Sequence, residues 1–159
     1  MKKVVIGLMV GLMSIGMVLA QDIKDDPAQV AFDAAKVLFT AKDYIKAQAA
    51  FEKVIKDYPN ASGKILANAQ MHIGHSLYRQ GKYVEAQAAF MACVQNYVWE
   101  LGAEHEEGVI WSAFNLVNPK LISTADYKAF LENTIKATKA TEENAKFLGR
   151  LKSELEKIK

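Results

Sequence analysis

Three histidines and a cysteine are the residues of this chain whose types suggest chemistry. His72 and His75 are three residues apart, which places both side chains on one face of a helix. A shared metal ion would need further ligands, because protein zinc sites take three or four. His105 begins the run His-Glu-Glu-Gly-Val, in which Val109 occupies the position of the second histidine of a zinc-protease motif. We therefore predict no metal site.

Cys93 is the only cysteine, and Val54 takes the same position in an earlier, similar segment. This favours a buried, structural thiol over a catalytic one, which would need a neighbouring base and a lowered pKa. The chain has no glycine-rich phosphate loop and no Gly-x-Ser-x-Gly elbow. Its carboxylates are scattered along expected helix faces. We predict a protein that is not an enzyme and uses no cofactor.

The elements around these residues are organised by an internal repeat. Residues 42–58 read KDYIKAQAAFEKVIKDY, and residues 81–97 read GKYVEAQAAFMACVQNY, at an offset of 39 residues. Repeats of this length are typical of stacked solenoids. Apolar residues recur at helical spacing and show no strand alternation. We predict helical repeats at about 28–60, 62–98 and 103–138, the third degenerate, and a capping helix at 141–158.

Several residues predict how these helices begin, end and pack. Pro27 fits the first turn of a helix, and Asp43, Ser62, Ser123 and Thr141 are expected at or near helix starts. Gly74 lies inside a helix, where glycine costs up to ~1 kcal/mol relative to alanine, which predicts close helix–helix approach. Trp111 is expected in the core, whereas Trp99 is the better candidate for exposure.

The repeat resembles the tetratricopeptide repeat in its small, aromatic and turn residues. The first unit shows Ala35, Leu38, Tyr44, Ala47, Phe51 and Pro59, and the second shows Gly74, Leu77, Gly81, Tyr83, Ala86 and Phe90. Residues 58–90 are similar to the exported subgroup typified by the periplasmic Tol–Pal coordinator and outer-membrane assembly factors. The 39-residue spacing exceeds the usual ~34, and Val98 replaces the second closing proline.

The resemblance implies an all-α solenoid of stacked antiparallel helix pairs that binds a protein or peptide segment in its concave groove. Carried over by position, the groove residues are Phe32, Lys36, Phe39, Asn68, Met71, His75, Tyr78 and Arg79, with Gln29 and Thr40 beside them. One alternative is that the third unit or the last helix covers this face and makes it core. Another is that the chain is a self-association module in which the last helix packs on a second copy, forming a homo-oligomer.

The first 20 residues resemble a secretory signal. Met1-Lys2-Lys3 is basic, residues 4–19 are apolar, and cleavage is expected between Ala20 and Gln21. An uncleaved membrane anchor is the alternative. Cleavage leaves 18 of the 20 basic residues against 18 acidic ones. This balance gives no reason to expect binding to nucleic acid or to an anionic membrane surface. We expect a linker at 21–27, a helical domain at 28–159, and a periplasmic or secreted location.

Overall fold

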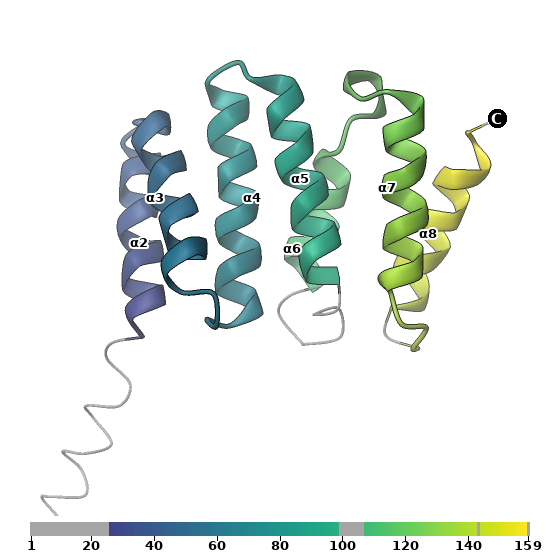
Figure 1. The fold of residues 1–159 in the computed structure, drawn as a ribbon, viewed down its shortest axis with the longest axis horizontal. Coiled ribbons are helices and arrows are strands. Elements are labelled where there is room, and N and C mark those ends of the chain that lie inside the picture. Colours follow the sequence, from purple (N-terminus) through teal and green to yellow (C-terminus); the bar gives the residue numbers. More distant parts are fainter. Residues whose placement is uncertain (1–25, 99–106, 143, 159) are drawn as a thin grey trace, which may run out of the picture.

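The helices line up in a row that is two helices deep, in which α6 lies behind α5 (Figure 1). The computed structural model describes residues 26–98, 107–142 and 144–158, and within them it contains helices and no strands. The helices are α2 (Pro27–Thr40), α3 (Tyr44–Asp57), α4 (Gly63–Arg79), α5 (Tyr83–Tyr97), α6 (Glu107–Leu116), the short 3-10 helix η2 (Pro119–Leu121), α7 (Thr124–Ala137) and α8 (Ala145–Glu156).

Consecutive helices pack as pairs, and the pairs stack. Helix α2 packs on α3, α4 on α5, and α4 also packs against α3 of the preceding pair. Helices α2 and α8 lie at opposite ends of the row (Figure 1). This arrangement confirms the predicted all-α solenoid. The predicted signal, residues 21–25 of the predicted linker, Trp99 and His105 lie outside the described residues. The last two residues of that linker, Asp26 and Pro27, are the N-cap and the first residue of α2.

Polar side chains cap several helix starts as the sequence predicts. Each accepts a hydrogen bond from a backbone N–H of the first turn, which satisfies a donor that the helix itself leaves unpaired. The predicted capping residues are Asp43, Ser62 and Ser123, and Asp26, which was expected in the linker, caps α2 in the same way. Gly81 follows α4 with φ +79°, a backbone conformation that glycine adopts without steric penalty.

The predicted start of the last helix is wrong by several residues. Thr141 was expected to cap it, but α8 begins at Ala145 with Asn144 as N-cap. The two side chains bond to each other's backbone: Thr141 Oγ1 accepts from Asn144 N (3.3 Å), and Asn144 Oδ1 accepts from Thr141 N (3.0 Å). These local bonds hold a turn in place of the first helical turn.

The core is built on one phenylalanine from each of four helices. Phe51 of α3, Phe90 of α5, Phe130 of α7 and Phe147 of α8 are each at most 1% exposed. Burying a side chain of this size contributes about 1.5–3 kcal/mol. A Cβ added at Gly74 would lie 2.4 Å from Phe90 Cε1. This close approach confirms the packing role predicted for Gly74.

The remaining core predictions concern Cys93 and Trp111. Cys93 is 0% exposed, as predicted, and its thiol bonds to Ala67 O at 3.3 Å. Trp111 is half-buried and meets the Phe147 ring edge-on, with centroids 5.0 Å apart, so it packs against the core as expected. Among the described residues, no helix combines the length and the apolar character that a membrane crossing requires.

Candidate protein-binding face

The predicted groove residues lie on two neighbouring helices, and those of α2 differ in exposure. Phe32 is buried at 8% exposure, and Phe39 is half-buried. Lys36 is exposed, and its Nζ lies 5.7 Å from the Phe32 ring centroid. On this helix, therefore, Lys36 reaches solvent while the two aromatic rings contribute mainly to packing.

The α4 residues become more accessible towards the C-terminal end of that helix. Asn68, Met71 and His75 are half-buried, and Asn68 Nδ2 donates to Lys64 O at 2.8 Å. Tyr78 is 50% exposed, and Arg79 is also exposed. Of the predicted set, Tyr78 offers the largest accessible aromatic surface.

His72 joins α4 to the preceding helix pair. Its ring stacks on Phe51 (centroids 4.9 Å apart, planes at 10°) and lies 5.3 Å from the Phe39 ring. Its Nδ1 is buried without a hydrogen-bond partner. Burial, aided by the nearby charges of His75 and Lys36, lowers the pKa of His72 to about 4. The imidazole is therefore neutral at pH 7 and acts as a packing ring.

Tyr78 lines a hollow that sequence reasoning did not predict. The hollow has a volume of about 580 Å³. Tyr83, 48% exposed, meets Tyr78 edge-on with ring centroids 5.0 Å apart. We call these two residues the tyrosine pair. The other lining residues come from α5, the end of α6 and η2, and they are Gln87, Asn115, Leu116, Val117, Asn118, Pro119 and Leu121.

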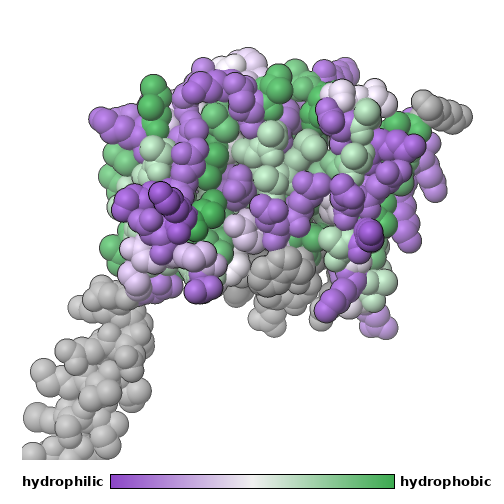
Figure 2. All heavy atoms as spheres, viewed as in Figure 1, coloured by the Kyte–Doolittle hydropathy of each residue, from purple (hydrophilic) through white to green (hydrophobic). Residues whose placement is uncertain are grey.

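A second hollow of about 400 Å³ lies between α5 and α7. Val84, Met91 and Phe130 give it apolar walls, and it shares Gln87 and Leu121 with the first hollow. Figure 2 shows apolar residues reaching the surface in the upper part of the molecule, around α5 and α7. Both hollows therefore lie at the junction of the second and third units.

The described residues offer little for catalysis or metal binding. Burial raises the pKa of the Cys93 thiol to about 12, so it is protonated at neutral pH. No group of three or more His, Cys, Asp or Glu side chains in the described part of the chain is arranged to hold a metal ion. What the surface does present is aromatic and aliphatic side chains, which suit contact with another protein.

Comparison with known families agrees with this architecture. The tetratricopeptide repeat family model matches residues 16–61 and 68–97, which include α2, α3, α5 and most of α4. The match and the paired helices together support a tetratricopeptide repeat protein. That class generally serves as a non-enzymatic scaffold for protein–protein interaction. Searches of curated proteins and of solved structures returned no match.

Proposed function

We propose that this chain is a non-enzymatic scaffold that binds a protein or peptide segment beside the end of α4 and the start of α5, with the tyrosine pair as its anchor. The observation that carries the proposal is the half-exposure of Tyr78 and Tyr83 beside a hollow whose walls are partly apolar. Tyrosines contribute strongly to interfaces because each buries a large apolar ring and keeps a polar hydroxyl at the rim.

The neighbouring groups define the kind of segment that would bind. Leu116 and Leu121 provide apolar walls for an aliphatic or aromatic side chain. Arg79 follows Tyr78 and is exposed, so it would pair with a carboxylate near that anchor. A segment with an apolar anchor and a flanking acidic residue therefore fits this face best.

Self-association through the last helix was the alternative to this function. Within the chain, Phe147 and Leu151 of α8 are both 0% exposed. Phe147 contacts Trp111 and Phe114, at centroid distances of 5.0 and 5.5 Å. The apolar face of α8 is thus covered by its own chain, and the structure gives no support to docking of that face on a second copy.

We also propose that the protein is exported and acts in a cell-envelope process. The support is the basic start and apolar run of residues 1–20, together with the resemblance of residues 58–90 to exported members of the family. Mass spectrometry of the protein from its native cells tests the first part. A chain beginning at Gln21 is the expected result, and an intact Met1 terminus on the exported protein would rule out cleavage.

Binding is tested by capture from the native cells after chemical crosslinking. The double variant Tyr78→Ser/Tyr83→Ser should lose a partner that the unchanged chain retains. Ile45→Ser removes an equally accessible apolar side chain, 70% exposed on α3, and should keep that partner. Circular dichroism must first show both variants folded. If both variants capture the partner equally well, the tyrosine pair is not part of the interface.

A further inference from the structure

The outer face of α2 carries apolar residues that nothing in the described structure covers. Val30 is 54% exposed and Val37 is 68% exposed. Ala34 and Ala41 are exposed at the same helical spacing. We call these four residues the α2 edge. Figure 2 shows apolar residues at the surface along the left margin, where α2 and α3 lie in Figure 1.

The second repeat unit shows how the corresponding face of α4 packs when another helix pair precedes it. An offset of 39 residues carries Val30, Ala34 and Val37 to Ala69, Ile73 and Ser76 of α4, which are 0%, 6% and 0% exposed. In α4 this side packs against the preceding helix pair. Gln80, the counterpart of Ala41, donates from Nε2 to Gln48 Oε1 at 2.9 Å. The α2 edge is therefore a stacking surface without its neighbouring unit.

The two ends of the row are finished differently. At the far end, α8 turns its apolar residues inward and leaves Lys146, Arg150 and Lys152 exposed. A terminal element with a polar outer face keeps a solenoid soluble. At the near end, two valines face outward instead. The apolar end exposes apolar surface to water, and a partner that covers it would stabilise the molecule.

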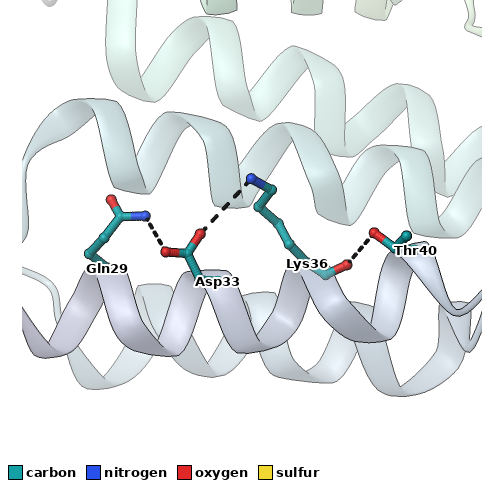
Figure 3. Close-up of polar contacts among 4 residues, drawn as sticks. All are labelled: Gln29, Asp33, Lys36 and Thr40. Carbon is teal, nitrogen blue, oxygen red and sulfur yellow. Dashed lines mark hydrogen bonds and ion pairs between the residues drawn. The ribbon is translucent and has the colours of Figure 1, made fainter.

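The charges on α2 indicate what kind of partner would cover the α2 edge. A polar row runs beside the α2 edge (Figure 3). Gln29 Nε2 donates to Asp33 Oδ2 at 3.0 Å, Lys36 Nζ lies 3.9 Å from Asp33 Oδ1, and Thr40 Oγ1 donates to Lys36 O at 2.8 Å. Asp33, Lys36, Val37, Thr40 and Ala41 also line one shallow hollow of about 610 Å³. One acid and one base thus lie in a single row beside the apolar stripe, and their charges cancel.

A neutral face with an acid and a base in sequence is complementary to itself. When the two-fold axis is perpendicular to α2 and passes between Asp33 and Lys36, the two copies of α2 run antiparallel and the acid of one faces the base of the other. The valines of both copies are then removed from water together. We propose that the α2 edge is the interface of a two-fold homodimer of this chain. This proposal does not depend on partner binding at the tyrosine pair.

A charge-swap experiment on the purified full chain tests the dimer. Asp33→Lys makes the polar row basic, and Lys36→Glu makes it acidic, so each variant alone should sediment as a monomer at concentrations where the unchanged chain is a dimer. An equimolar mixture of the two should regain the dimer, because their charges are opposite. Ile45→Lys, which alters an equally exposed apolar residue on α3, should remain dimeric.

Recovery of the dimer in the mixture also shows that the swapped chains are folded. The proposal is overturned if the unchanged chain is monomeric up to millimolar concentration, as it would be if residues 1–25 or a different protein covered the α2 edge. It is equally overturned if either single variant stays dimeric or if the mixture stays monomeric.

Discussion

At the scale of single residues, Gly74 lets the Phe90 ring lie against the backbone of α4. Alanine at this position would place its methyl group 2.4 Å from Phe90 Cε1, and Phe90 is only 1% exposed. The overpacking penalty of about 1–3 kcal/mol exceeds the gain of ~1 kcal/mol in helix propensity. We expect Gly74→Ala to lower the free energy of urea unfolding.

Gly149 of α8 provides the matched control for that measurement. A Cβ added there has nothing within 4 Å, so Gly149→Ala should stabilise the chain by up to ~1 kcal/mol. Equal stabilisation by both substitutions would show that the Phe90 contact is not tight.

The lowered pKa of His72 predicts that the stability of the chain depends on pH. Its pKa is lowered from 6.5 to about 4 in the folded chain, chiefly by burial. Above pH 6.5 the ring is neutral in both states and contributes no pH dependence. As the pH falls from 6.5 to about 4, the unfolded chain takes up the proton first, and stability is lost. We expect a loss of about 1 kcal/mol at pH 5, after allowance for partial solvent exposure.

Comparison with His72→Phe isolates this contribution. Phenylalanine preserves a ring stacked on Phe51 but carries no proton, so the variant should lose less stability between pH 7 and pH 5 in urea unfolding. His75, whose pKa is also lowered by burial and by Arg79, remains in both chains. Identical pH slopes for the two proteins would contradict the assignment.

At the scale of elements, α8 closes one end of the row. Phe147 is 0% exposed and contacts both Trp111 and Phe114 of α6. Phe147→Ala should therefore destabilise the chain by about 3–5 kcal/mol, measured by thermal unfolding. Lys152→Ala changes an exposed residue of the same helix and should have little effect. A Phe147→Ala chain as stable as the control would mean that α8 is not docked.

The helices themselves could be predicted because their residues repeat. Phe51 and Phe90 occupy equivalent positions in the AQAAF blocks, and both are fully buried. Exposure in the third unit could not be predicted in this way. Leu77 is 8% exposed, whereas Leu116, its counterpart at the same offset, is 37% exposed, because α6 turns a different face to its neighbours. Spacing alone cannot specify that rotation.

Tyr78 was among the predicted groove residues, but its neighbour Tyr83 was missed for the same physical reason. Tyr83 fits the aromatic position of the repeat, and its type and spacing match those of Tyr44, which is half-buried. Whether such a ring is covered depends on the helices packed beside it. Tyr44 meets the Phe39 ring edge-on at 5.4 Å, and Tyr83 meets the Tyr78 ring edge-on at 5.0 Å but also borders a hollow.

At the scale of the whole molecule, the two proposed interaction surfaces lie at different places along the row of helices. The tyrosine pair borders the hollow lined by α5, the end of α6 and η2. The α2 edge lies at the end of the row, where Figure 1 shows α2. A two-fold dimer through α2 would thus leave both tyrosine pairs free and present two binding faces. Two linked sites raise the apparent affinity for a partner that carries repeated segments.

Site-specific photocrosslinking in the native cells tests the central claim most directly. A photoreactive phenylalanine analogue is placed at Tyr78, and in a second chain at Ile45 of α3 as control. The account predicts a covalent adduct with a partner protein from position 78 and none with that protein from position 45. The absence of any heterologous adduct at position 78, or the same adduct at both positions, would contradict a binding face anchored by the tyrosine pair.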